Sequence, residues 1–351
     1  MKFYKKALLI AFLFVLVGCA KNNSTPQTQK VSDEGNVVVT NNSDNTNDYK
    51  MILLDGKYPT SKTRGASLTL LTPVNIAEFE VGLTDLSKIQ FPANQYYFLE
   101  GQYLPNQDIQ KWLQVQNGEN PDGLNKSNTP KAISTILEQD YMLLVDNGYE
   151  LNGVSIGIAL NPQVNDTLLS DNNLLELGKE AATKIVERIR TKEGMGNIPI
   201  LIGLFKQSID NGASRGSYLS YAVSKSGVSL SEWKPVNVEK RLFPLDNDKT
   251  DDVSVFSTFK KSVESFFPNL NGIVGEATFI DGTMSELNIT VTTQFYGQSE
   301  MIALTQFLVE KANAYSASNL NVKIKVESVR GTEAVIHKKQ GETVFHSVVL
   351  H

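Results

Sequence analysis

Near the middle of the chain lies the run Leu151-Asn152-Gly153-Val154-Ser155-Ile156-Gly157-Ile158-Ala159-Leu160. Its large apolar side chains at positions 154, 156, 158 and 160 alternate with small residues, a period that is typical of a β-strand. Apolar residues at helical spacing follow between Leu174 and Ile189, and two strand-like runs follow at 198–205 and 218–223. This order of strand, helix, strand and strand predicts an α+β fold.

The same order of elements occurs again later in the chain. Residues 287–293 alternate as a strand, an apolar stripe at helical spacing runs from Met301 to Tyr315, and strand-like runs follow at 322–326 and 334–337. We therefore expect mixed or antiparallel sheets with packed helices, and a duplicated strand-helix-strand-strand unit is our hypothesis. The alternative is that so common an arrangement recurs by chance.

A polar, acidic segment at 226–252 separates the two patterns, and a helical stripe from Val253 to Phe266 follows it. We expect a first α/β domain at 49–225 and a second at 226–351. Before the first pattern, we expect a strand at 68–71 closed by Pro73 and a helix over 109–116. A second helix is predicted to open at Thr129-Pro130, with a buried stripe formed by Ile133, Ile136, Leu137, Tyr141, Leu144 and Val145.

The N-terminal segment reads as a secretory signal peptide. A cationic start containing Lys2, Lys5 and Lys6 precedes an unbroken apolar run at 7–17, which ends in Gly18-Cys19. A small residue before Cys is typical of a bacterial lipobox, so residues 1–18 are the expected signal peptide, with lipidation at Cys19 and cleavage between Gly18 and Cys19. The apolar run is too short for a stable transmembrane helix. Residues 19–48 are mostly polar and are expected to form a flexible tether to the outer face of the membrane.

Composition narrows the classes of function. The chain has 351 residues, of which 41% are hydrophobic and 20% charged, so a packed core is expected. A formal charge of −5 offers no basic surface for nucleic acid. The one cysteine is Cys19, so the folded region has no thiol for a disulfide, a thiolate metal site or a cysteine nucleophile.

One pattern points to catalysis. The residues from Gly153 to Gly157 satisfy the G-x-S-x-G pattern of a serine-hydrolase nucleophile elbow, with Ser155 as the candidate nucleophile and His337, His346 or His351 as the candidate base. An elbow requires a sharp turn from strand to helix, whereas the alternation continues through Ser155. We favour a strand whose glycines allow close backbone contacts, and we assign no catalytic residues.

Two further patterns suggest metal binding. Residues 246–252 begin like a calcium loop but lack the glycine and the bidentate Glu that an EF-hand needs, so we interpret them as a solvated loop whose Asp252 caps the next helix. The histidines lack HExxH spacing, and His346 and His351 are interpreted as exposed tail residues. We predict no metal site and no cofactor.

Aromatic side chains are dense between residues 91 and 112. Flat apolar rings suit sugars or peptides, so a ligand groove is a hypothesis. The candidate residues are Tyr96, Tyr97, Tyr103 and Trp112.

Several stretches resemble the CamS family of sex pheromone precursor lipoproteins. They are Thr63-Arg64-Gly65, Phe98-Leu99-Glu100-Gly101-Gln102-Tyr103-Leu104, Asn120-Pro121-Asp122-Gly123-Leu124-Asn125 and the run from Leu151 to Asn161. The resemblance implies that the cleaved signal peptide is itself a product, released as a hydrophobic peptide that provokes a mating response in plasmid-bearing cells. The matching heptapeptide is Phe12-Leu13-Phe14-Val15-Leu16-Val17-Gly18, or a neighbouring register such as 11–17.

Two functions for the mature part follow as alternatives. The first is a surface-anchored binding or interaction module with an unidentified ligand, held to the lipid bilayer by diacylglyceryl-Cys19 after processing by signal peptidase. The second is an extracellular serine hydrolase that uses Ser155. We favour the binding module and expect no enzyme.

Overall fold

The computed structural model describes residues 30–31, 38–39, 48–63, 73–146, 148–164, 166–209, 215–244, 251–266 and 270–350. The expected strand at 68–71, the signal peptide and Cys19 lie outside these residues. In the first half the elements are β1 (Lys30–Val31), β2 (Val38–Val39), β3 (Lys50–Leu53), α1 (Pro73–Ser87), β4 (Tyr97–Glu100), α2 (Asn106–Leu113), β5 (Val115–Gln116), β6 (Asn125–Lys126), β7 (Ile133–Val145), β8 (Gly148–Leu160), β9 (Gln163–Val164), β10 (Thr167–Leu168), α3 (Asp171–Arg190), β11 (Ile200–Lys206), β12 (Ser217–Ser224) and β13 (Lys234–Pro235). The second half has β14 (Val238–Phe243), α4 (Asp251–Phe266), β15 (Leu270–Ile280), β16 (Thr283–Thr293), α5 (Gln298–Ala312), the 3-10 helix η1 (Asn313–Tyr315), β17 (Asn321–Ser328), β18 (Gly331–Lys338) and β19 (His346–Val349).

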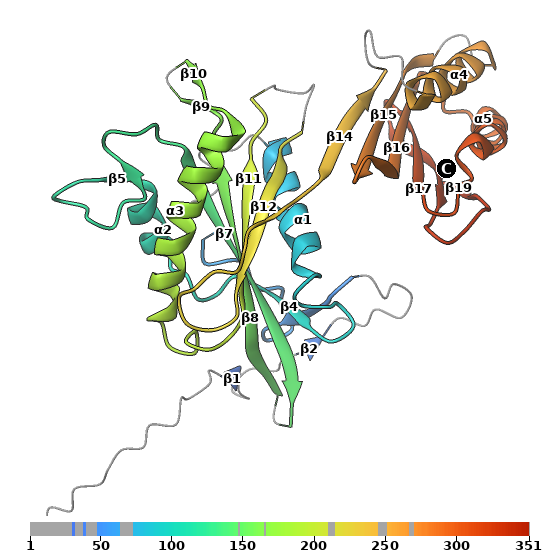
Figure 1. Ribbon diagram of the computed structural model, residues 1–351. Helices are drawn as coiled ribbons and strands as arrows, with labels where there is room; N and C mark the ends of the chain where they lie inside the picture. The colour runs from blue at the N-terminus through green and yellow to red at the C-terminus, as the bar shows by residue number, and fades with distance from the viewer. Residues whose placement is uncertain are drawn as a thin grey trace, which may run out of the picture.

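The first sheet has the strand order β13-β12-β11-β8-β7-β4-β3-β2, and β1 pairs with β8. Helices cover both faces (Figure 1). Phe79 and Leu83 of α1 pack against one face, while Ile109 of α2 and Ile185 of α3 pack against the other. The central strands β7, β8 and β11 are therefore buried on both faces over most of their length.

The second sheet has the order β14-β15-β16-β17-β18-β19. Its core contains Phe256 and Phe259 from α4 together with Leu304 and Leu308 from α5. Both helices therefore lie on one face, as Figure 1 also shows. On the opposite face the side chains are largely polar, a division that mixed and antiparallel sheets tolerate.

The duplicated pattern extends further than the sequence indicated. Apart from the small separate sheets β5-β6 and β9-β10 and the 3-10 helix η1, the order in each half is strand, helix, two strands, helix and three strands, running β4-α2-β7-β8-α3-β11-β12-β13 and β14-α4-β15-β16-α5-β17-β18-β19. The pairings agree at every step, with one parallel pair in each, β8 with β11 and β16 with β17. The other pairs in these six-strand orders are antiparallel. The predicted α+β class is confirmed, and the two halves share one topology.

The prediction of a helix that opens at Thr129-Pro130 is wrong, because residues 133–145 form strand β7. Every side chain from Ile133 to Met142 is buried, since layers cover both faces of the sheet. The expected helix at 109–116 is α2, which ends at Leu113, so Gln116 lies in β5 instead. Helix α4 begins at Asp251, which places Asp252 inside the first turn rather than at the cap.

Two dipeptides of the predicted tether pair with the first sheet. Lys30 and Val31 pair with Glu150 and Tyr149 of β8, and Val38 and Val39 pair with β3. The expectation of a flexible tether therefore does not hold for these four residues.

Ion pairs connect the two halves. Arg215, just before β12, donates from Nε and Nη2 to Glu276 Oε2 of β15, at 3.0 and 2.8 Å. Lys240 of β14 lies 2.5 Å from Glu78 of α1 and 3.9 Å from Glu276. The four side chains are between 16% and 23% exposed, so solvent screens them less than it screens fully exposed pairs.

Candidate functional site

The predicted aromatic groove residues do not share one surface. Tyr96 packs against the core cluster on the α1 side of the first sheet. Tyr97, Tyr103 and Trp112 pack against the cluster on the α2 and α3 side. Trp112 is 5% exposed, and the guanidinium of Arg188 lies 5.1 Å from its ring centre. These rings are mainly part of the core or its margin.

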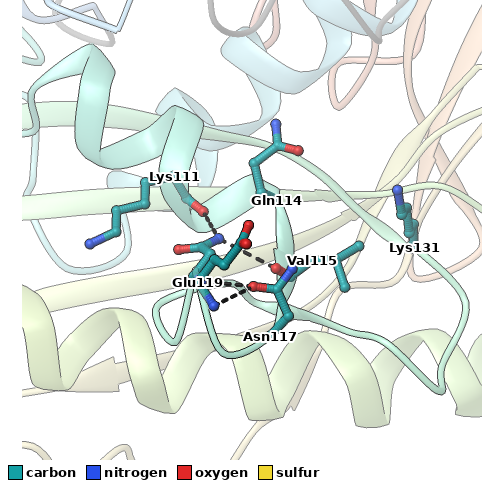
Figure 2. Close-up of a pocket in the computed structure, with 7 residues that line it drawn as sticks. Lys111, Gln114, Val115, Asn117, Glu119 and Lys131 are labelled. Atoms are coloured by element: carbon teal, nitrogen blue, oxygen red, sulfur yellow. Dashed lines mark hydrogen bonds between the residues drawn. The ribbon is translucent and has the colours of Figure 1, made fainter.

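A shallow pocket of about 440 Å³ lies beside α2, and none of the four predicted aromatic residues lines it. It is formed by the end of α2, the turn that follows, and Lys131 ahead of β7 (Figure 2). Six of the seven lining residues are polar or charged, and Val115 is the one apolar residue among them. The lining residues are Lys111, Gln114, Val115, Asn117, Glu119, Asn120 and Lys131.

Local hydrogen bonds hold the turn beneath this pocket. Asn117 Oδ1 accepts the backbone N–H groups of Glu119 and Asn120 at 2.9 and 2.7 Å, an Asx-type turn. Asn120 Nδ2 donates to the Lys111 carbonyl at 2.9 Å, whereas its Oδ1 is buried without a hydrogen-bond partner. The turn beneath the pocket is therefore fixed by hydrogen bonds within it.

Lysines lie at the two sides of the pocket in Figure 2, with Glu119 and Asn117 between them. Lys111 pairs with Asp122 at 2.5 Å, and this hydrogen bond lowers the pKa of the Asp122 carboxyl. Lys131 is exposed and Glu119 is its nearest opposite charge in the lining. Amides and ammonium groups in this arrangement can bind a small ligand that carries hydroxyl or carboxylate oxygens.

A buried carboxyl pair lies deeper in the same half, on β7. Glu138 and Asp140 are both 0% exposed. Glu138 Oε2 accepts the backbone N–H of Leu104 at 2.9 Å and that of Tyr103 at 3.2 Å. Asp140 Oδ2 accepts the N–H of Gln102 at 2.8 Å, and its Oδ1 is buried without a hydrogen-bond partner. The two side chains thus hold the turn that follows β4.

Burial raises the pKa of Glu138 to about 7, although the N–H groups of Leu104 and Tyr103 oppose this shift. Burial also raises the pKa of Asp140 well above its usual value, and the charge of Glu138 adds to the effect. The pair therefore keeps a proton near neutral pH, because two adjacent charges would be costly to bury. Sequence reasoning missed this pair, whose only signal was two acidic residues two positions apart.

Ser155 lies in the middle of strand β8 and not on an elbow, because β8 continues to Leu160. It is 0% exposed and accepts a hydrogen bond from Ser87 Oγ at 2.7 Å. The glycine interpretation is confirmed: a Cβ at Gly153 would lie 2.0 Å from Phe91 Cε1, and one at Gly157 would lie 2.7 Å from Phe79. The pattern G-x-S-x-G thus serves the packing of rings against β8.

The other sequence candidates have separate places. Residues 246–250 of the calcium-like loop and His351 lie outside the described residues. Within the described ranges, no group of three or more His, Cys, Asp and Glu side chains is placed to hold a metal ion. Over the same residues, no helix is both long and apolar enough to cross a membrane.

Three of the four stretches that suggested a family touch β7. Strand β4 and residues 151–160 of β8 pair with it on opposite edges. Asn125, which ends the stretch from Asn120, exchanges hydrogen bonds with the backbone of Ile133. The stretch also supplies Asn120 to the pocket. Of the stretch from Thr63, only Thr63 is described, and it is buried.

The fold therefore defines an α+β protein built from two halves of one topology, with a polar pocket on the first. A family model described as the CamS sex pheromone cAM373 precursor matches residues 58–343. The chain belongs to this family, which confirms the resemblance seen in its sequence.

Among solved structures, the chain is similar to the sex pheromone precursor of Lactobacillus salivarius subsp. salivarius UCC118. The identity is 34%, the TM-score is 0.84, and the match covers 90% of this chain and 99% of that one. It is also similar in fold to the C-terminal domain of the sex pheromone staph-cAM373 precursor from Staphylococcus aureus, with 24% identity, a TM-score of 0.65, and coverage of 80% and 98%. None of the curated proteins matches the chain.

Proposed function

We propose that this chain is a lipoprotein precursor that yields two products, a hydrophobic signalling peptide and a lipid-anchored binding protein. The observation that carries the proposal is membership of a sex pheromone precursor family. The N-terminal sequence supports it, because a cationic start, an apolar run and Gly18-Cys19 are the features that lipoprotein processing requires. The peptide is Phe12-Leu13-Phe14-Val15-Leu16-Val17-Gly18, or the neighbouring register 11–17.

Mass spectrometry tests the first product. Cells expressing the full chain should release a peptide ending at Gly18 or Val17, and the membrane-bound protein should have the mass of a chain that begins at diacylated Cys19. The matched control is Cys19→Ser, which removes the thiol that is acylated before cleavage. We expect both products to disappear in that variant. Equal amounts of peptide from the control, or a mature protein without lipid, would overturn the processing scheme.

We further propose that the second product is a binding module and not an enzyme, and that it binds through the polar pocket beside α2. The two lysines and the side-chain amides of the lining support this role, because they offer charged and neutral hydrogen-bond donors to ligand oxygens. The released peptide is a poor fit, because its side chains are apolar whereas six of the seven lining residues are polar or charged. A small ligand with hydroxyl and carboxylate groups fits better.

The pocket is tested with a defined probe, an N-acetylated amino acid added to the full chain in detergent. Ligand-observed NMR should detect binding that Lys131→Gln weakens several-fold, because the variant removes one of the two exposed cations of the lining. Lys192→Gln is the matched control, since Lys192 pairs with Asp108 and does not line the pocket. Equal binding by the chain and by Lys131→Gln would remove this pocket as the site.

A further inference from the structure

The two described histidines lie side by side on the second sheet. His337 of β18 and His346 of β19 are directly opposed in the antiparallel register. Their ring centres are 5.5 Å apart, with an angle of 31° between the ring planes. The expectation that His346 is exposed is confirmed, but its interpretation as a tail residue is wrong, because it lies in β19 at the edge of the sheet.

This pair points away from the core. Neighbouring Ile336 and Ala334 of β18 belong to the core with α4 and α5, so the alternate position, His337, faces the side that these helices leave open. The side chain of His346 is 57% exposed. His337 is half-buried, and strand pairing fixes the spacing of the two backbone positions without a ligand.

We propose that His337 and His346 form a binding site for a divalent transition-metal ion that prefers imidazole ligands, such as Zn²⁺, with water in the remaining positions. Imidazole suits Zn²⁺, Cu²⁺ and Ni²⁺. A metal bound about 2.1 Å from each ring nitrogen lies about 3.2 Å from each ring centre. When one nitrogen of each ring points at the metal, ring centres 5.5 Å apart correspond to an angle of about 120° at the metal, close to tetrahedral geometry.

Two charged side chains next to the pair act in opposite directions. Glu342 Oε2 lies 3.7 Å from His346 Nε2 and attracts a cation, while it also accepts the N–H of Lys339 at 3.1 Å. Lys323 of β17 is opposed to His337 in the register and repels a cation. With two protein ligands rather than the four of a structural zinc site, the site binds an exchangeable ion.

Equilibrium dialysis with Zn²⁺ tests the proposal on the untagged full chain in detergent. A background of Cys19→Ser and His351→Gln removes the one thiol and the third histidine, so that His337 and His346 are the only imidazoles present. We expect one ion per chain. His337→Gln and His346→Gln should each weaken binding at least tenfold, and the double variant should be no weaker than either single variant, because a chelate is lost with its first ligand.

Lys323→Gln is a further variant with the opposite expected effect. It should tighten zinc binding several-fold, since it removes the positive charge next to His337. Thermal melting followed by circular dichroism without zinc checks that each variant is folded. If His337→Gln unfolds at a lower temperature than the background chain, the test rests on His346→Gln, because the side chain of His346 is exposed. Wild-type affinity in His346→Gln would overturn the proposal. So would a background chain that retains no more zinc than the double variant.

Discussion

Replacing Glu138 by Gln should make the first half of the protein more stable at alkaline pH. The pKa of Glu138 rises from 4.5 to about 7 on folding because the side chain is buried. At about 1.4 kcal/mol per pKa unit, this shift corresponds to about 3 kcal/mol. A raised folded pKa means that the folded state holds the proton more tightly, so the contribution of Glu138 to the free energy of unfolding is largest below pH 4.5 and is lost as the pH rises through about 7.

Glu138→Gln keeps the shape of the side chain and an oxygen that can accept the Leu104 N–H, while its amide can donate to the unpartnered Oδ1 of Asp140. We therefore expect little change near pH 5 and a gain of up to about 3 kcal/mol at pH 8. Asp140→Asn should act in the same direction, because the pKa of Asp140 is raised by the same burial.

Urea unfolding followed by tryptophan fluorescence measures this change. The two tryptophans of the chain, Trp112 and Trp233, both pack against the core of the first sheet, so the signal reports the half that contains the pair. Glu193→Gln is the matched control, since Glu193 is exposed. If Glu138→Gln lost stability between pH 5 and pH 8 as steeply as the wild type, or were less stable at pH 8, the reasoning would be refuted.

Three further predictions concern packing and ion pairs, and urea midpoints measure each. Gly153→Ala should lower the free energy of unfolding by about 3 kcal/mol, because its Cβ would lie 2.0 Å from a ring carbon of Phe91. Gly118→Ala is the control and should change stability little, because a Cβ there would have nothing within 4 Å. Equal losses of stability in the two variants would contradict the prediction. Arg190→Met should also cost about 3 kcal/mol, since the guanidinium donates to four backbone carbonyls; a loss below about 1 kcal/mol would show that water replaces them. Glu276→Gln removes a partly exposed ion-pair partner and should lower the free energy of unfolding by at most about 1 kcal/mol, a loss that decreases with added salt. A larger loss that salt does not change would contradict this prediction.

The strand-helix-strand-strand order could be predicted from the sequence because the apolar residues of these elements recur with a regular strand or helix period. Strand β8 alternates large and small residues, and α3 carries a continuous apolar stripe from Leu174 to Ile189. The same holds for β16 and α5. The flanking β4, β14, β15 and β19 were not predicted. Strands β4 and β19 have only four residues each, which is too short for periodicity to distinguish from a loop.

The pocket beside α2 could not be predicted in the same way. Its residues come from the end of a helix, a turn of irregular backbone and the segment before β7. Nothing in a linear pattern shows that Lys131 lies near Lys111, because their approach depends on how the turn folds back. That Asn120 Oδ1 is buried without a hydrogen-bond partner is likewise a property of the folded turn. The aromatic residues were visible in the sequence, but ring density predicts a core as readily as a groove.

The error at β7 and the buried carboxyl pair have one cause. Apolar residues at 133, 136, 137, 141, 144 and 145 surround the polar segment Glu138-Gln139-Asp140, a distribution that suggests a helix with one polar face. In the strand these polar side chains are buried instead: Glu138 and Asp140 bind the turn after β4, and Gln139 Nε2 donates to Thr84 of α1 on the other face. A helical pattern assumes that charge marks solvent. In β7 the polar side chains instead form hydrogen bonds to neighbouring segments. The residues that misled the prediction are therefore those that position α1 and the turn at 102–104.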